Sequence, residues 1–214
     1  MAGTKQIDPR ARRFFEAAEP LLERFGYRKT TVEDVCRAAG MSKRTFYELF
    51  SDKNDLLLQW METMINDMTE SWEASLPPDL DPLSRLYSFL DLYVRMVREH
   101  PAMRVAVEDI ELMRMFGAQL DQIRLAQLGG PVDRILKDGM AVGQFRQLDP
   151  KAAMWVVFGL LDTVYLLTPH IMGAPGPLED PHLAEETRQF IVRGLGALGA
   201  GSDDPKVARG EAGG

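Results

Sequence analysis

The amino-acid sequence predicts an all-α protein with about nine helices divided between two parts. Three observations support this fold class. Apolar residues recur every three or four positions along most of the chain, which is the spacing of one helix face. The dipeptide Asp-Pro, in which Asp caps a helix and Pro takes its first position, occurs at 8–9, 149–150 and 180–181. No alternating pattern of useful length predicts a strand.

The first helix is predicted to begin at Pro9 and to stop at Gly26. Pro20 lies inside it and cannot donate to the carbonyl of Glu16, so we expect a kink there. Basic residues lie just before this helix and in its first turn, and together they form a basic lead-in. We expect the first seven residues of the chain to be disordered. The apolar face predicted to be buried consists of Phe14, Phe15, Ala18, Leu22 and Phe25, and the basic residues are Lys5, Arg10, Arg12 and Arg13.

Two short helices follow, separated by a tight turn. Thr31 and Asp34 form a capping box at the start of the first of them, although an imperfect one. Gly40 ends this helix because a residue just past a helix end often needs positive φ. Ser42 can cap the next helix through its hydroxyl. The segment 30–53 therefore predicts a helix-turn-helix, a motif that also occurs in bundles without nucleic-acid binding.

The second short helix has two different faces. Phe46, Leu49 and Phe50 share an apolar face that should pack, whereas Lys43, Arg44 and Tyr47 share another that should point outward. The string Thr-Thr-Val-x-Asp-Val-x-x-x-Ala-Gly-Met-Ser-Lys-x-Thr-Phe-Tyr-x-x-Phe-x-x-Lys closely resembles the DNA-binding domain of the TetR family of bacterial transcriptional repressors. About fifty N-terminal residues carry the resemblance, and the rest matches only in helical layout.

The resemblance implies a DNA-binding domain over residues 1–53, a ligand-binding and dimerisation domain over 54–200, and a flexible tail over 201–214. Lys43 and Arg44 suit guanine edges in the major groove, and Thr45 suits a thymine methyl or a phosphate. Five other residues suit phosphate oxygens, which set register without reading sequence. These are Thr30, Thr31, Ser42, Tyr47 and Lys53. For any one of these side chains, a solvated surface role is a serious alternative.

The second part is predicted to hold the remaining helices. A fourth helix from about Lys53 to Leu76, capped by Ser51 or Asp52, joins it to the first part. A fifth is expected to open at Pro82, a sixth to cover about 102–115, and a seventh about 118–139, kinked or split at 129–131. The eighth should run from Pro150 to about Leu167 and the ninth from Pro181, burying Phe190, Ile191, Leu195 and Leu198.

The resemblance also implies a small-molecule ligand in the second part, and a repressor that leaves a palindromic operator when this ligand binds. Methionines and aromatic residues form adaptable apolar cavities, which favours an apolar or aromatic ligand, although such residues more often belong to a plain core. Asp162 interrupts an apolar helix, so we expect it to meet a partner helix, a cationic ligand or another subunit, or to lie at a wet edge. The candidate ligand residues are Trp60, Met64, Met68, Phe89, Tyr93, Phe116, Trp155 and Asp162.

A homodimer is the expected assembly. In the family that this sequence resembles, the last two helices form a four-helix bundle with the same pair of a second subunit. Two recognition helices would then lie about 34 Å apart, on successive turns of one DNA face. The alternative is that both helices are buried within one subunit.

Composition limits the other possibilities. Residues 1–59 carry 11 Lys+Arg and 9 Asp+Glu, hence +2, within a chain of net charge −7, so the remainder carries −9. No leader pattern is seen and Cys36 is the only cysteine, which favours the cytoplasm. The apolar run 152–167 is shorter than the roughly 20 residues of a membrane span. We therefore expect no membrane partner.

Enzyme chemistry finds little support in the sequence. The three histidines, His100, His170 and His182, lie far apart, and the carboxylates of Glu108, Asp109 and Glu111 favour a solvated face over a metal site. We expect no catalytic residue, no metal and no cofactor. An all-α small-molecule-binding protein or hydrolase without DNA binding is the alternative, and it would leave the face from Lys43 to Lys53 dispensable.

Overall fold

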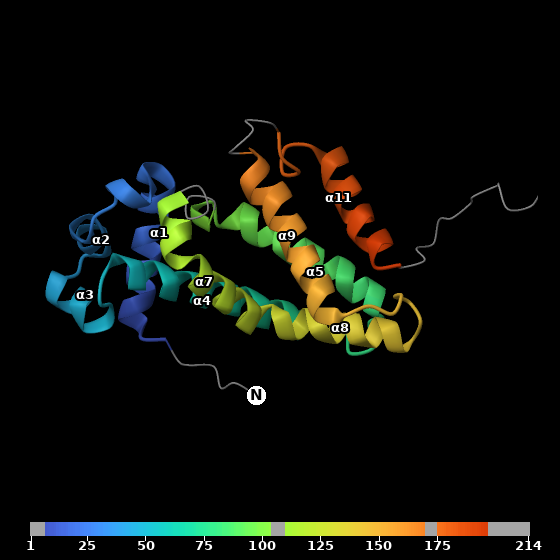
Figure 1. The fold of residues 1–214 in the computed structure, drawn as a ribbon. Coiled ribbons are helices and arrows are strands. Elements are labelled where there is room, and N and C mark those ends of the chain that lie inside the picture. Colours follow the sequence, from blue (N-terminus) through green and yellow to red (C-terminus); the bar gives the residue numbers. More distant parts are fainter. Residues whose placement is uncertain (1–6, 104–109, 170–174, 197–214) are drawn as a thin grey trace, which may run out of the picture.

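This computed structural model describes residues 7–103, 110–169 and 175–196 of the chain. Within these residues the backbone forms nine α-helices and one π-helical turn, and no strand. Helices α1 (Pro9–Lys29), α2 (Val32–Ala39) and α3 (Lys43–Leu49) make a head at one end of the molecule, and α4 (Lys53–Ser75) runs from this head into a helical body (Figure 1). The expected all-α, two-part architecture is confirmed.

Aromatic rings hold the head together. Phe14 of α1 meets the ring edges of Phe46 and Phe50, with ring centroids 5.4 and 5.7 Å apart. All three side chains are at most 1% exposed. Such edge-to-face pairs add to the burial energy and fix relative orientation. Because this face of α3 is locked against α1, its opposite face must point outward.

The expected caps of α2 and α3 are confirmed, whereas α1 continues past the expected stop at Gly26 to Lys29. The Thr31 hydroxyl accepts a hydrogen bond from the backbone N–H of Asp34, whose carboxylate accepts one from the backbone N–H of Thr31, so the capping box is complete. Gly40 ends α2 with a φ of 64°, in the left-handed region. Ser42 accepts from the backbone N–H of Thr45 at 3.1 Å and begins α3. These caps set the angle between the two helices.

Helix α1 differs from the expectation in two details. Its dihedral angles remain helical through Pro20, and the irregular residue is Gly26, with φ 76° and ψ 167°. A proline removes one hydrogen bond without requiring non-helical dihedral angles, whereas glycine adopts positive φ at little cost. Phe25, which we expected inside, is 46% exposed because it lies beside this break.

The body contains α5 (Pro82–Glu99), α7 (Ile110–Gln127), α8 (Gly129–Ala141), α9 (Pro150–Asp162) and α11 (Pro181–Gly194). The π-helical turn Thr163–Leu167 continues α9 directly. Helix α4 packs against α7 and α5, while α8 packs against α5, α7 and α9. Helix α11 lies on the outer side of α5 and α9 (Figure 1), and Arg188 pairs there with Asp91 at 2.7 Å.

One expected boundary in the body is wrong and another is confirmed. The break expected between Met115 and Ala118 is absent, and α7 continues through Gly117, since a single glycine costs a helix only about 1 kcal/mol relative to alanine. The split expected near Gly129 is confirmed, because α7 ends at Gln127 and α8 begins at Gly129. Pro131 fits the first turn of α8, where backbone N–H groups lack helical partners.

Several expectations concern residues outside the described ranges. They are the N-terminal segment with Lys5, the carboxylates Glu108 and Asp109, His170, Leu198 and the tail 201–214.

Candidate nucleic-acid interface

The outward face of α3 carries the three side chains expected there. The side chains of Arg44 and Lys43 are 91% and 57% exposed, and Tyr47 is 57% exposed. They follow one another along the first turn and a half of the helix, and Ser42 caps its start. This is the part of a recognition helix that reaches base edges in the major groove. The described part of the body leaves this face uncovered.

Three hydroxyl groups lie at or near the starts of α2 and α3. Thr31 caps α2 and Ser42 caps α3, both of them exposed, and Thr45 in the first turn of α3 is half-buried. The hydroxyls of Ser42 and Thr45 lie 2.9 Å apart. Exposed hydroxyls and backbone N–H groups at helix starts suit phosphate oxygens.

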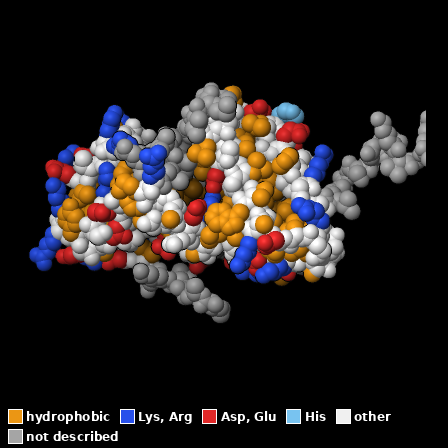
Figure 2. Space-filling view, in the orientation of Figure 1, with side chains coloured by type: hydrophobic (Ala, Val, Ile, Leu, Met, Phe, Trp, Pro, Cys, Tyr) orange, Lys and Arg blue, Asp and Glu red, His pale blue; other side chains and the backbone are white. Residues whose placement is uncertain are grey.

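In the free protein, acidic residues form ion pairs with the cations of this face. Glu33 of α2 accepts a hydrogen bond from Lys43 at 2.9 Å, which lowers the pKa of the Glu33 carboxyl and raises that of the Lys43 ammonium. Glu48 lies 3.3 Å from Arg44 and 3.2 Å from Arg10, so one carboxylate serves two arginines. Figure 2 accordingly shows blue and red side chains mixed over the head. DNA phosphates can replace these carboxylates as partners of the cations.

Two residues expected at phosphates lie elsewhere. Thr30 is 2% exposed, and its hydroxyl donates to the carbonyl of Gly26 at 2.8 Å. The ammonium of Lys53 donates to the carbonyls of Tyr27 and Thr30, at 2.7 and 2.9 Å. It also lies 4.0 Å from the centroid of the Tyr27 ring. Both side chains thus donate to carbonyls at and after the break within α1, so we leave them out of the interface.

The arginines of the lead-in are also engaged within the protein. Arg12 pairs with Asp67 of α4 at 2.8 Å, and Arg13 donates to the carbonyl of Ala39 at 3.0 Å, at the end of α2. Arg10 pairs with Asp8 at 2.8 Å besides Glu48. They fasten α1 to its neighbours, a function that the sequence pattern did not suggest.

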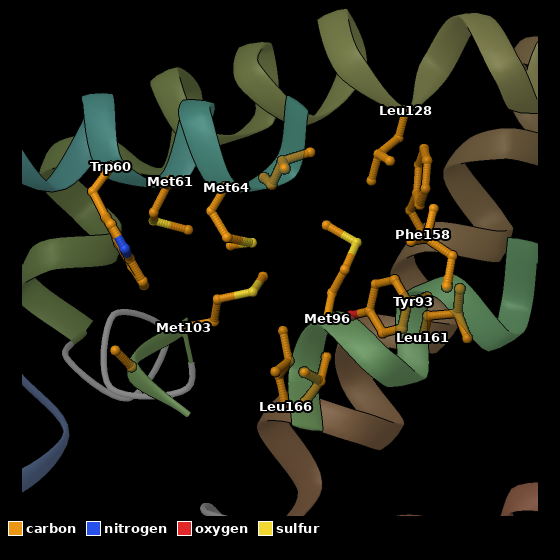
Figure 3. Close-up of a cluster of buried hydrophobic side chains, with 14 of the residues drawn as sticks. Trp60, Met61, Met64, Tyr93, Met96, Met103, Leu128, Phe158, Leu161 and Leu166 are labelled. Atoms are coloured by element: carbon orange, nitrogen blue, oxygen red, sulfur yellow. The ribbon is translucent and has the colours of Figure 1, made fainter. Parts of the chain in front are cut away.

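In the body, four of the expected ligand residues lie inside. Side chains from α4, α5 and α9 point toward one another between these helices and α7 (Figure 3). Trp60, Met64, Phe89 and Tyr93 are each at most 6% exposed. Their neighbours in this cluster, which the sequence did not single out as ligand residues, are Met61, Met96, Met103, Leu128, Phe158, Leu161 and Leu166.

The other four have different surroundings. Met68 and Phe116 are half-buried and pack at the edge of the core, and Trp155 is 45% exposed on α9. Asp162 accepts a hydrogen bond from Tyr93 of α5 at 2.7 Å and one from Arg124 of α7. Asp162 therefore meets partner helices, which is one of the surroundings that the sequence left open for it. Burial, and next the charge of Asp162, raise the pKa of Tyr93 well above its ordinary value.

Helix α9 exposes an apolar stripe. Over the described residues, one helical stretch, Pro150–Leu167, has the length and hydropathy of a membrane span, yet only 33% of it is buried. Its outer side carries Trp155 and Val156, the latter 68% exposed, followed one turn later by Gly159. On α11, Phe190, which we expected to be buried, is 70% exposed. Large apolar side chains exposed on a helix surface suit contact with another apolar surface.

Groups suited to catalysis or metal binding are scarce in the described ranges. Cys36 is 5% exposed, and burial raises the pKa of its thiol, so little reactive thiolate forms. His, Cys, Asp and Glu side chains of these ranges do not gather in threes where a metal could bind.

Residues 14–59 match the family model TetR_N, described as bacterial regulatory proteins of the tetR family. The chain is 23% identical over 189 residues to YhgD, an uncharacterised HTH-type transcriptional regulator of Bacillus subtilis, a match covering 88% of this chain and 97% of that protein.

Solved structures share the fold over nearly the whole chain. The fatty acid degradation regulator FadR from Bacillus halodurans superposes with a TM-score of 0.73 at 20% identity, covering 90% of this chain and all of that one. The regulator FadR from Bacillus subtilis, solved in complex with stearoyl-CoA, gives a TM-score of 0.70 at 18% identity and covers 86% and 98% of the two chains.

Proposed function

We propose that this chain, which belongs to the TetR family of bacterial transcriptional regulators, is a repressor that binds a palindromic operator as a homodimer and releases it when an apolar ligand enters the body. Its relatives are transcriptional regulators, a class that typically lacks catalysis. A regulator of this kind acts on chromosomal DNA, so we place it in the cytoplasm.

One observation supports the DNA-binding mode above all others, namely the exposure of the cationic face of α3. Lys43 and Arg44 stand at the start of the helix, and Arg44 is 91% exposed. A guanidinium or ammonium in this position donates to guanine O6 and N7. We assign Thr31, Ser42, Thr45 and Tyr47 to the flanking phosphates, because they place hydroxyls at the starts of α2 and α3 and along α3.

The apolar stripe of α9 supports a homodimer. Trp155, Val156 and Phe190 would lose their exposure against the same side chains of a second copy, as a twofold axis requires. Gly159 follows Trp155 and Val156 by one turn of α9 and has open space where a Cβ would stand, so a partner helix can approach closely there. A dimer also doubles the contacts that one recognition helix makes, which a useful affinity requires.

The interior of the body supports an apolar ligand. Methionine side chains are unbranched and adapt to different shapes, and Met61, Met64, Met96 and Met103 belong to the same buried cluster (Figure 3). A relative of this fold was solved with stearoyl-CoA. We therefore favour a ligand with a long apolar portion for this chain as well.

Helix α4 connects the two events. Its Trp60 lines the interior and also meets the ring edge of His100, the residue that ends α5, with ring centroids 6.4 Å apart. His100 Nδ1 lies 2.6 Å from a carboxylate oxygen of Glu19 in the head. A ligand that favours a different tilt of α4 moves the two heads of the dimer out of register with the two operator half-sites. The affinity for DNA then falls by the ratio of the ligand's affinities for the two tilts.

The direct test is selection of DNA fragments from the source genome by the purified full-length chain, followed by gel shift. We expect one or a few palindromic fragments to be retained. The variant Lys43→Ala/Arg44→Ala should lose this selection while keeping its helix content by circular dichroism. Equal selection by the variant would contradict the assignment of α3 as the reading helix.

A further inference from the structure

The body contains one polar cluster beside its apolar interior. Tyr93 of α5 donates to Asp162 Oδ1 at 2.7 Å, and Arg124 of α7 donates to the other oxygen of the same carboxylate. Arg124 Nη2 also donates to Asp121 at 2.6 Å. The cluster thus joins three helices at the point where α9 passes into its π-helical turn.

Arg124 keeps one donor that this cluster does not use. Its Nε is buried and has no hydrogen-bond partner among the described residues. The guanidinium carbon lies 5.0 Å from the centroid of the Phe158 ring and 6.0 Å from that of Trp155. Buried donors in proteins are nearly always paired, so an unpaired one calls for an acceptor from outside the chain. The flanking aromatic rings offer at most a weak π acceptor.

The donor adjoins the space proposed for the ligand. Phe158, which contacts the guanidinium, belongs to the converging side chains of Figure 3, together with Tyr93 and Leu128. Trp60 and Met103 lie at the other end of this cluster, toward the head. On α5, Tyr93 and His100 mark the two ends, about 10 Å apart by helical rise. These side chains therefore form an elongated cluster that is apolar along its length and polar at one end.

Charge selects the chemistry of the polar end. The carboxylates of Asp121 and Asp162 outnumber the single guanidinium of Arg124, and Asp121 is 47% exposed while Asp162 is 27% exposed. A carboxylate head would meet this net negative charge, and an ammonium head has no lone pair for Nε–H. A neutral carbonyl accepts the hydrogen bond without adding charge.

We infer that Arg124 Nε anchors a neutral carbonyl group, such as that of an ester, thioester, amide or ketone, at the end of an elongated apolar ligand. This inference rests on the ligand response proposed above. Tyr93 and Asp162 act as positioning residues, because they hold the guanidinium against Phe158. Recognition of the head group is thereby separated from burial of the chain.

Isothermal titration of the full-length protein with methyl decanoate, decanoate and decylamine tests the inference, since the three probes differ only at the head. We expect methyl decanoate to bind about tenfold more tightly than the other two, the effect of one hydrogen bond to a charged group. The variant Arg124→Lys keeps a cation beside Asp162 but lacks Nε–H, and should bind all three within about twofold. Arg134→Lys, at an arginine of α8 whose side chain is 61% exposed, is the matched control and should keep the preference.

Equal affinity of the wild type for the three heads would overturn the inference, as would a preference that survives in Arg124→Lys, or failure of every probe to bind. The comparison of probes on the wild type stands even if the variant fails to fold. Operator binding measured without any probe tests the regulatory function separately. A protein that shifts its operator but ignores the head group would retain the proposed function and lose only the role of Arg124.

Discussion

The ammonium of Lys43 donates a 2.9 Å hydrogen bond to the carboxylate of Glu33, so α2 supplies the counter-charge for the first cation of the recognition helix. Glu48 does the same for Arg44 and Arg10. Because DNA must displace these carboxylates, they weaken binding to every sequence alike. A head with a charge of only +2 over residues 1–59 is then expected to discriminate mainly through base contacts.

Replacing Glu33 by Gln should raise affinity for operator and non-operator DNA by about two- to fivefold, because exposed ion pairs are weak. Fluorescence anisotropy with two labelled duplexes measures both affinities. Glu23→Gln changes the net charge equally at an exposed position of α1 and serves as the control. An equal gain in DNA affinity for Glu23→Gln would mean that the effect comes from net charge and not from the Lys43–Glu33 pair.

Arg44→Ala should weaken operator binding by about 1–3 kcal/mol and non-operator binding much less, since a guanidinium at a guanine edge reads sequence. The measured quantity is the ratio of the two dissociation constants at fixed salt. Arg95→Ala, an exposed arginine of α5 in the body, should leave the ratio unchanged. Parallel losses on both duplexes would mean that Arg44 contacts only phosphate.

Lys53→Ala should lower the free energy of unfolding by about 1–3 kcal/mol, because two carbonyls after the break in α1 lose a charged donor. Urea denaturation followed by circular dichroism gives this value. Lys151→Ala, at an exposed lysine of α9 whose described hydrogen bond is made by its backbone, is the control. Unchanged stability with weakened DNA binding would restore Lys53 to the phosphate contacts.

Val156→Glu should weaken the dimer by several kcal/mol, since the twofold axis would bring two carboxylates together at an apolar contact. Sedimentation equilibrium measures the dimer dissociation constant. Val142→Glu is matched closely, because Val142 is 64% exposed and Val156 is 68% exposed. Dimers that withstand the change at Val156 would place the interface elsewhere.

Asp81 gives a pH dependence with a defined sign. It caps α5, and hydrogen bonds from Ser84 followed by weaker contacts with Gln144 and Leu83 lower the pKa of its carboxyl below the ordinary 3.8. A lowered pKa contributes stability above pH 3.8 that is lost as pH falls through the folded value. Asp81→Asn should therefore be less stable than wild type at neutral pH.

The two unfolding curves should converge in acid, below the lowered pKa of Asp81. Thermal unfolding at a series of pH values follows this difference, and Asp79→Asn, at an exposed carboxylate of the same loop, is the control. A gap between wild type and Asp81→Asn that stays constant into acid would contradict a contribution from the ionised carboxylate.

The sequence by itself determined the all-α fold, most of the helix boundaries, the caps in the head and the two faces of α3. Thr31, Gly40 and Ser42 act through neighbours three residues away or through their own dihedral angles, so local spacing predicts them. The apolar face with Phe46 and the cationic face with Arg44 follow from the helical period alone. Charge division along the chain likewise needs no coordinates.

Only the tertiary structure decided which side chains are available. The sequence predicts Thr30 and Lys53 at the DNA surface. In the structure, both donate hydrogen bonds to backbone carbonyls at the break around Gly26. Arg124 lies 38 positions before Asp162 and meets it only because α7 packs near α9. Trp155 and Phe190 fit an apolar periodicity yet face outward, because period identifies an apolar face and not what covers it.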